Sequence, residues 1–341
     1  MLPHQGYCPG RTGIAPANVS AVTAPVLFCT DTFWDDRGDE IVAIDPTVEV
    51  VRLVGKEHVT PSDLERITIA YFSPDTWPER AANFMGTCVR APKLHWLQTF
   101  SAGVDSPIFT SLRERGVVVT NSAGASAPSI ARTVLLYLLA LSRDLPRLGR
   151  EQAKRRWEPR SFVDLSSLRL GIVGLGAIGT EVARLAAAFE METIGLRRSV
   201  QGDEICETWA DDRLGDLLGW ADAIAVTAPL TDDTRNMFDA AAFAQMRPGS
   251  WFINVGRGEI VDEPALIEAL VDGHLGGAGL DVFAIEPLPP DSPLWVLPNV
   301  IITPHSSGTT DLSHRRQVDM FVDNFRRHTA GESLANVVDN S

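Results

Sequence analysis

The stretch LGIVGLGAIG, residues 170–179, decides the fold of this chain. Its apolar start predicts a buried strand, and Gly174, Gly176 and Gly179 follow in the spacing G-x-G-x-x-G. A helix is predicted directly afterwards, over residues 177–189, because one face gathers Ile178, Val182, Leu185, Ala186 and Phe189. In such a unit the first glycine permits a tight turn, the second admits a pyrophosphate and the third lets helix and strand pack closely. The stretch therefore predicts a dinucleotide-binding unit; the alternative is a βα turn without a ligand.

Length and charge narrow the class of protein. At about 150 residues per domain, 341 residues suggest two domains. The chain has 30 Lys and Arg against 44 Asp and Glu, so its formal net charge is 30 − 44 = −14. This balance argues against a nucleic-acid partner, which requires a basic surface. The longest apolar run, residues 134–141, is too short for a membrane span of ~20 residues, so no membrane partner is expected.

The cysteines and the first residues indicate a cytoplasmic protein. Cys8, Cys29, Cys88 and Cys206 are widely spaced and form no C-x-x-C pair, so we expect neither a disulfide framework nor a metal site. Residues 1–25 lack the apolar segment of a signal peptide and are expected to form a loose leader.

Short apolar strands alternate with helices, the pattern of parallel sheets covered on both faces. Strands are predicted at 26–30, 48–54, 67–72, 94–99, 117–120, 170–173, 193–196, 223–227, 251–255, 277–282 and 300–303. Long helices over 128–143 and 312–329 suggest that the chain leaves a first domain and returns to it. We expect residues 1–121 and 310–341 to form a substrate domain around a dinucleotide-binding domain at 122–309. The basic segment 147–159 is interpreted as a solvated crossing between them.

The residues after the strand predicted at 193–196 bear on the choice between NAD and NADP as the cofactor. An acidic residue at this point would bind the ribose 2′-hydroxyl of NAD. This chain has Arg197-Arg198-Ser199 instead. Two guanidinium groups and a hydroxyl suit a 2′-phosphate, so NADP(H) is favoured over NAD(H), which stays possible. The alternative is a pair of solvated surface arginines.

Three strand ends bring together groups suited to reducing a 2-keto acid. Arg257 lies between two glycines, Glu286 lies in GLDVFAIEPLP at 279–289, and His305 lies in TPHSSG at 303–308. Histidine can donate the proton that the carbonyl oxygen needs, and a carboxylate can orient it. A guanidinium can hold the substrate carboxylate. Each residue alone also fits a structural role.

Together with APLT at 228–231 and INVGRGEIVDE at 253–263, these motifs make the sequence resemble the D-isomer-specific 2-hydroxyacid dehydrogenase family. The resemblance covers at least residues 26–322. It implies an α/β fold: a Rossmann dinucleotide-binding domain plus a discontinuous flavodoxin-like substrate domain, with the active site in the cleft. It also implies homodimers.

The resemblance implies roles for individual residues. His305 is the expected acid/base, Glu286 its partner, and Arg257 a substrate-binding residue. Ser101, Ala102, Gly103 and Val104 are expected to bind the substrate carboxylate, with Arg257 and His305; an ordinary N-cap turn is the alternative for that loop. Asp281 resembles the residue that binds the nicotinamide carboxamide. The expected cofactor-binding residues are Gly174, Gly176, Ala177, Ile178, Gly179, Arg197, Arg198, Ser199, Ala228, Pro229, Thr234, Val255, Gly256, Arg257, Asp281, His305 and Ser307.

The expected activity is NADP-dependent reduction of a small 2-keto acid of the glyoxylate or hydroxypyruvate class, or the reverse oxidation of a D-2-hydroxy acid. Two alternatives stay open. A phosphoglycerate dehydrogenase is disfavoured because no regulatory domain follows before Ser341. The second is a nucleotide-sensing interaction protein similar to the corepressors that share this fold. The chain departs from the family at Arg132, near which relatives usually have a glutamate.

Overall fold

The apolar strands around the glycine loop join in one seven-stranded parallel sheet. The computed structural model describes residues 24–338, so the predicted leader lies almost entirely outside it. Strand β6 (Arg169–Val173), which precedes the loop, pairs with β7 (Glu192–Leu196) and with β9 (Ala223–Val226). The sheet order is β12-β11-β10-β9-β6-β7-β8, where the other strands are β8 (Glu207–Trp209), β10 (Trp251–Asn254), β11 (Gly277–Leu280) and β12 (Val300–Ile302). This is the Rossmann order with one further strand, as predicted.

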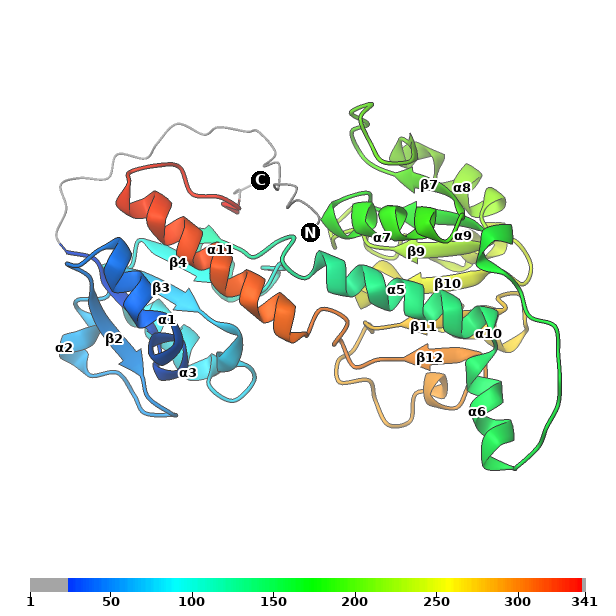
Figure 1. Ribbon diagram of the computed structural model, residues 1–341, viewed down its shortest axis with the longest axis horizontal. Coiled ribbons are helices and arrows are strands. Elements are labelled where there is room, and N and C mark those ends of the chain that lie inside the picture. Colours follow the sequence, from blue (N-terminus) through cyan, green and yellow to red (C-terminus); the bar gives the residue numbers. More distant parts are fainter. Residues whose placement is uncertain (1–23, 339–341) are drawn as a thin grey trace, which may run out of the picture. The chain divides into compact units, whose positions relative to one another are not determined.

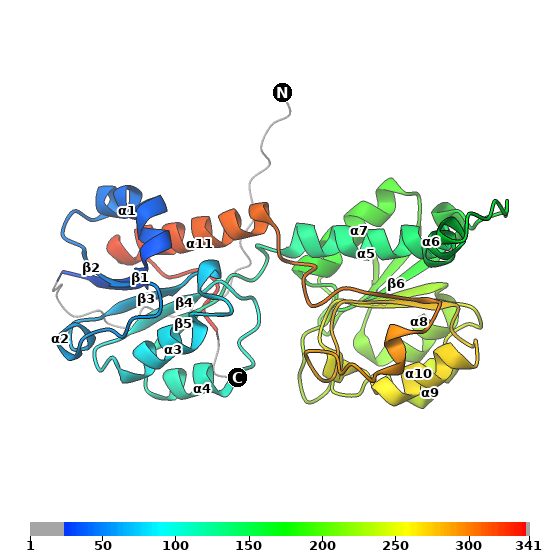
Figure 2. The same ribbon diagram turned by 90° about the horizontal axis from the view of Figure 1, so that it is seen from below.

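Helices cover both faces of this sheet (Figure 2). One face carries α5 (Ala127–Ser142), which leads into α6 (Leu145–Ala153), and α7 (Ala177–Ala188). The other carries α8 (Leu214–Trp220), α9 (Ala240–Gln245) and α10 (Glu263–Val271). The two apolar cores lie between the sheet and these layers. Single 3₁₀ turns are η2 (Leu165–Ser167), η3 (Asp211–Arg213), η4 (Gly258–Ile260) and η5 (Pro293–Trp295).

A second sheet has five parallel strands in the order β2-β1-β3-β4-β5. Figure 1 shows this sheet in blue to cyan, and its strands are labelled in Figure 2. They are β1 (Val26–Thr30), β2 (Glu49–Leu53), β3 (Ile69–Phe72), β4 (Trp96–Thr99) and β5 (Val118–Thr120). This is the order of flavodoxin-like folds, and it agrees with the expected class.

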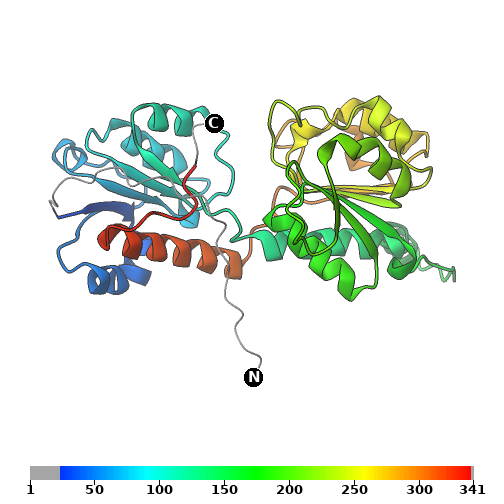
Figure 3. The same ribbon diagram turned by 90° about the horizontal axis from the view of Figure 1, so that it is seen from above.

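The covering helices of the second sheet come from both ends of the chain. Helices α1 (Asp31–Ile44) and α11 (Asp311–Thr329) lie on the same face (Figure 2, Figure 3). The other face carries α2 (Pro61–Leu64), α3 (Ala81–Arg90) and α4 (Pro107–Glu114), while η1 (Pro74–Thr76) follows β3. Phe321 of α11 is fully buried and stacks on Tyr71 of β3 with ring centroids 4.2 Å apart. Burying such a ring contributes ~1.5–3 kcal/mol.

The chain divides into two compact units. Met1–Ser122 and His314–Ser341 form one, named here the discontinuous unit. Ala123–Ser313 forms the other, the continuous unit. The second boundary lies in the first turn of α11. Among residues 24–338, no helix combines the length and apolarity needed to cross a membrane.

Two expectations were wrong. The basic segment 147–159 is no crossing between domains, because it lies wholly within the continuous unit and begins in α6. Its Arg147 side chain is only 13% exposed and pairs with Asp144 at 2.7 Å. Phe189 is 39% exposed and lies outside the buried face of α7. That face presents the smaller residues Gly179, Val182, Ala183 and Ala186, because they allow a close approach to the sheet.

Candidate active site

The three glycines of the loop after β6 have three different surroundings. Gly174 has φ +98°, and a Cβ there would lie 2.5 Å from the backbone of Ala228. A Cβ on Gly179 would lie 2.5 Å from the carbonyl oxygen of Gly174, so this glycine lets α7 approach the loop. A Cβ on Gly176 would meet nothing within 4 Å. The first and third glycines are therefore needed for packing, whereas the second leaves open space that a ligand can occupy.

The start of α7 offers hydrogen-bond donors to that space. Its N-cap is Gly176, which has no capping side chain. Among the described residues, the N–H groups of Ala177, Ile178 and Gly179 have no acceptor. Unpaired N–H groups at a helix N-terminus favour an anion through the donors and the helix dipole. These residues thus fit the pyrophosphate of a dinucleotide.

The two arginines after β7 differ in what they contact. Arg197 forms an ion pair with Glu204, with Nη1 3.6 Å from Oε1. Glu204 also accepts hydrogen bonds from the N–H groups of Gln201 (2.6 Å) and Gly202 (2.8 Å), and these bonds, with Arg197, lower its pKa. Arg198 and Ser199 are exposed, and within residues 24–338 the Arg198 side chain has no ion-pair partner. Arg198 is therefore the arginine whose guanidinium is available to a ligand.

His305 and Glu286 form a hydrogen-bonded pair. The Nδ1 atom of His305 lies 2.8 Å from Oε2 of Glu286, and Oε1 accepts the N–H of Phe283 at 3.0 Å. Because an ionised carboxylate can only accept, this bond places the proton of the neutral ring on Nδ1. The His305 side chain is 51% exposed, and among the described residues its Nε2 atom has no hydrogen-bond partner, so the Nε2 lone pair is available. This arrangement suits a histidine that exchanges a proton with a substrate.

Arg257 follows β10, the strand beside β11. The Asn254 side chain donates to the carbonyl of Arg257 at 3.0 Å, which fixes the turn. A Cβ on Gly258 would overlap the backbone of Phe283, so this turn lies directly against the segment that leads to Glu286. The three predicted catalytic residues therefore come from the ends of β10, β11 and β12, which are neighbours in the sheet.

Asp281, at the end of β11, holds the turn that contains His305. It is 1% exposed, and its Oδ1 atom accepts from Thr303 Oγ1 (2.5 Å) and from the N–H groups of Ser306 (2.9 Å) and Ser307 (3.1 Å). Its carbonyl accepts the N–H of His305 at 2.8 Å. His305 has φ +50°, a left-handed conformation that costs energy for a non-glycine residue. The Asp281 carboxylate thus stabilises a strained turn.

A buried tyrosine extends this network. The Tyr137 hydroxyl of α5 hydrogen-bonds Thr303 Oγ1. Thr303 donates its only hydroxyl proton to Asp281, so Tyr137 must be the donor to Thr303. Burial raises the pKa of Tyr137, which keeps it protonated. No sequence motif marks Tyr137. A Cβ on Gly279 would lie 2.4 Å from the tyrosine ring, but this close approach is visible only in the folded chain.

In the discontinuous unit, the loop after β4 offers N–H groups as well. The N–H of Ser101 is bound by Thr99 Oγ1 at 3.2 Å, and its hydroxyl donates to the carbonyl of Gly103 at 2.8 Å. The N–H groups of Ala102, Gly103 and Val104 have no acceptor in the described part of the chain. Three consecutive donors of this kind suit a carboxylate.

The comparisons with known proteins agree with these motifs. The family model for the D-isomer specific 2-hydroxyacid dehydrogenase NAD binding domain matches residues 135–307. Glyoxylate/hydroxypyruvate reductase B of Pectobacterium carotovorum subsp. carotovorum is 36% identical over 259 residues, which cover 73% of this chain and 80% of that protein. The chain belongs to the D-isomer-specific 2-hydroxyacid dehydrogenase family.

Other members resemble the chain over different lengths. D-3-phosphoglycerate dehydrogenase of Methanocaldococcus jannaschii is 33% identical over 254 residues, 73% of this chain but 48% of that protein, so the chain spans about half its length. A crystal structure of a D-isomer specific 2-hydroxyacid dehydrogenase from Xanthobacter autotrophicus Py2, in complex with NADPH and MES, has a TM-score of 0.76 and 32% identity. The match covers 93% of the present chain and 98% of the chain in that crystal structure. The predicted family and α/β fold are thereby confirmed, and the family's enzymes are oxidoreductases of the expected class.

Proposed function

We propose that this dehydrogenase reduces small 2-keto acids of the glyoxylate or hydroxypyruvate class with NADPH, and in reverse oxidises D-2-hydroxy acids. The observation that carries the proposal is the 2.8 Å bond between His305 Nδ1 and Glu286, which leaves Nε2 without a hydrogen-bond partner among the described residues. The open glycine loop in the same unit supports the cofactor assignment.

His305 exchanges the proton of the reaction. A bound nicotinamide supplies the hydride that reduces the keto carbon. The carbonyl oxygen, which becomes a hydroxyl, takes its proton from Nε2 of the His305 imidazolium. Glu286 faces the other ring nitrogen and stabilises the positive charge of that imidazolium. Because His305 is exposed, solvent restores its proton after each turnover, and in the oxidation the neutral ring accepts the proton instead.

The substrate carboxylate is assigned to two sets of donors. The N–H groups of Ala102, Gly103 and Val104 are available in the discontinuous unit. Arg257 supplies a guanidinium, and such charge-assisted bonds contribute ~1.5–3 kcal/mol each. We assign Asp281 chiefly to the support of the His305 turn, because its carboxylate oxygens already accept several bonds there.

NADP(H) is assigned through Arg198 and Ser199. Both are exposed just after β7, where a 2′-phosphate is expected in a Rossmann unit. The solved relative from Xanthobacter autotrophicus contains NADPH. The ion pair of Arg197 with Glu204 lessens the contribution of that arginine.

We also propose a homodimer that forms through the continuous unit. Leu136 of α5 and Leu145 of α6 are exposed, and Trp157, in the loop that follows α6, is 93% exposed. Exposed apolar side chains of this kind often mark a protein interface. Light scattering after gel filtration gives the molar mass directly, and a monomer over the micromolar range would refute the dimer.

The decisive experiment is a cofactor oxidation assay. Purified protein is mixed with NADPH, or with NADH, and with glyoxylate, hydroxypyruvate, pyruvate or phenylpyruvate, and loss of nicotinamide absorbance is followed. Faster turnover with NADPH on a small keto acid is the expected result. A preference for NADH would overturn the assignment of Arg198 but not the reaction. Nucleotide binding without turnover of any keto acid would refute the reductase and favour a nucleotide sensor.

A further inference from the structure

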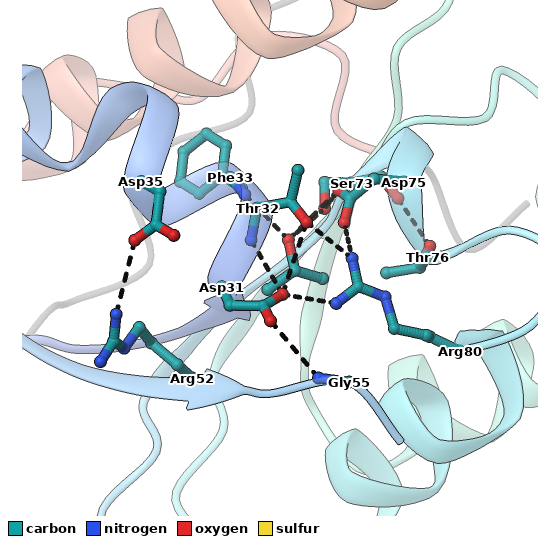
Figure 4. Close-up of polar contacts among 11 residues, drawn as sticks. Asp31, Thr32, Phe33, Asp35, Arg52, Gly55, Ser73, Asp75, Thr76 and Arg80 are labelled. Carbon is teal, nitrogen blue, oxygen red and sulfur yellow. Dashed lines mark hydrogen bonds and ion pairs between the residues drawn. The ribbon is translucent and has the colours of Figure 1, made fainter. Parts of the chain in front are cut away.

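An arginine in the discontinuous unit is held between two carboxylates (Figure 4). Arg80 forms ion pairs with Asp31, the first residue after β1, and with Asp75, just beyond β3. The same guanidinium donates to Thr32 Oγ1 at 3.0 Å. The Arg80 side chain is 13% exposed, against 28% for Asp31 and 27% for Asp75. We name these three residues the Asp31–Arg80–Asp75 triad.

Neighbouring groups fix the two carboxylates. Asp31 accepts the N–H of Thr32 at 2.8 Å, and Asp75 accepts the hydroxyl protons of Ser73 and Thr30. Burial disfavours the charged form of Asp31, but the bonds from Arg80 and Thr32 outweigh it, so the pKa of Asp31 lies below its usual value. With one guanidinium facing two carboxylates, the formal charge of the triad is −1. The Arg80 charge is therefore already neutralised.

The triad occupies the place where this fold normally binds ligands. The strand order β2-β1-β3-β4-β5 reverses between β1 and β3, and ligands of doubly wound sheets bind outside the carboxyl ends at that point. The loop with the free N–H groups follows β4, the next strand. Phe72 pairs with Thr99 in register, and the N–H of Phe100 donates to Phe72 at 2.9 Å. The triad thus lies one to two strand spacings, ~5–10 Å, from the root of that loop.

We propose that the Asp31–Arg80–Asp75 triad makes this enzyme select singly charged 2-keto acids and reject those with a second anionic group, phosphorylated ones above all. The proposal rests on the function proposed above, in which the N–H groups of Ala102–Val104 bind the substrate carboxylate. A three-carbon substrate anchored there is short, so its far end stays within range of the triad, which lies ~5–10 Å from the root of that loop. A phosphate at that end meets a net negative charge, and like charges at such distances repel appreciably in a partly buried setting.

The test compares two substrates that differ only by a phosphate group, hydroxypyruvate and 3-phosphohydroxypyruvate. The wild-type kcat/KM is expected to favour hydroxypyruvate at least tenfold, and the ratio should shrink as KCl screens the repulsion. Asp75→Asn makes the triad neutral, so the ratio should fall about tenfold, through a lower KM for the phosphorylated substrate.

Glu114→Gln is the matched control. It removes the same charge from an exposed position at the end of α4, at the opposite edge of the sheet, and should leave the ratio unchanged. Asp31→Asn repeats the test should Asp75→Asn fail to fold. Equal wild-type turnover of both substrates, or an unchanged ratio in the variant that still turns over hydroxypyruvate, would overturn the proposal. If the wild type turns over no keto acid at all, the proposed function itself is refuted instead.

Discussion

The carboxyl edges of the two sheets are built alike but offer different chemistry. Both sheets are parallel, so their strand ends gather at one edge. In the continuous unit glycines follow β6, and the N–H groups at the start of α7 have no acceptor among the described residues. In the discontinuous unit Asp31 and Asp75 follow β1 and β3. Arg80 occupies the corresponding place at the strand ends and forms ion pairs with both carboxylates. The fold thus decides where a ligand binds, and the first residues after each strand decide which ligand.

The largest expected effect concerns His305, the exposed group at the edge of the continuous sheet. His305→Asn removes the proton donor, and general acid catalysis typically contributes ~10²–10⁴-fold to the rate. We expect kcat to fall by that range while the Kd of NADPH changes little. His58→Asn, at an exposed position of the discontinuous unit, is the control. A kcat within threefold of the wild type would remove His305 from the mechanism.

The next effect separates the two arginines after β7. Arg198→Ala should raise the Kd of NADPH by about ten- to a hundredfold, the equivalent of one charge-assisted bond, and leave the Kd of NADH unchanged. Arg197→Ala should have a smaller effect, because Arg197 already pairs with Glu204. Isothermal titration with both cofactors measures this difference. Equal losses for NADPH and NADH would show that neither arginine recognises the 2′-phosphate.

A third prediction concerns the support of the His305 turn. Thr303→Val keeps the shape of the side chain but breaks the chain from Tyr137 through Thr303 to Asp281. The strained turn should loosen, so kcat should fall roughly tenfold, as expected for the loss of one buried hydrogen bond that leaves its partners unpaired. The pH profile of kcat should shift, and Thr303→Ser should restore both. A variant with reduced melting temperature but unchanged kcat and pH profile would limit Thr303 to a structural role.

The same contrast explains what could be predicted from the sequence. Strand β1 has the predicted bounds, because a continuous apolar run is a local signal. Strand β8 was missed because it is a three-residue edge strand with no buried residue. Helix α6 was missed because its basic residues suggested a solvated loop.

The site shows the same limit. The glycine loop and the motifs around Arg257, Glu286 and His305 are contiguous in sequence, so they were found. The bond between Tyr137 and Thr303 joins residues 166 positions apart, and the ion pair between Arg80 and Asp31 joins residues 49 apart. No local sequence pattern marks either pair. The first depends on how α5 packs on the sheet near β11, and the second depends on the pairing of β1 with β3. Such networks become visible only once the chain is folded.

The smallest effect expected lies at the opposite, amino edge of the discontinuous sheet. His95 precedes β4, and its Nε2 atom lies 3.3 Å from that of His328 near the end of α11. Burial lowers the pKa of both, and for His328 the neighbouring His95 lowers it further. As the pH falls below ~6.5, the unfolded chain therefore binds more protons than the folded chain. This pair thus lowers the free energy of unfolding as the pH falls from 7.5 to 5. His328→Gln removes one of the two rings. The fall in Tm across that pH range should then be smaller by on the order of 1–3 °C, measured by calorimetry. Parallel pH curves for the variant and the wild type would show that the two rings titrate alike in the folded and unfolded chain.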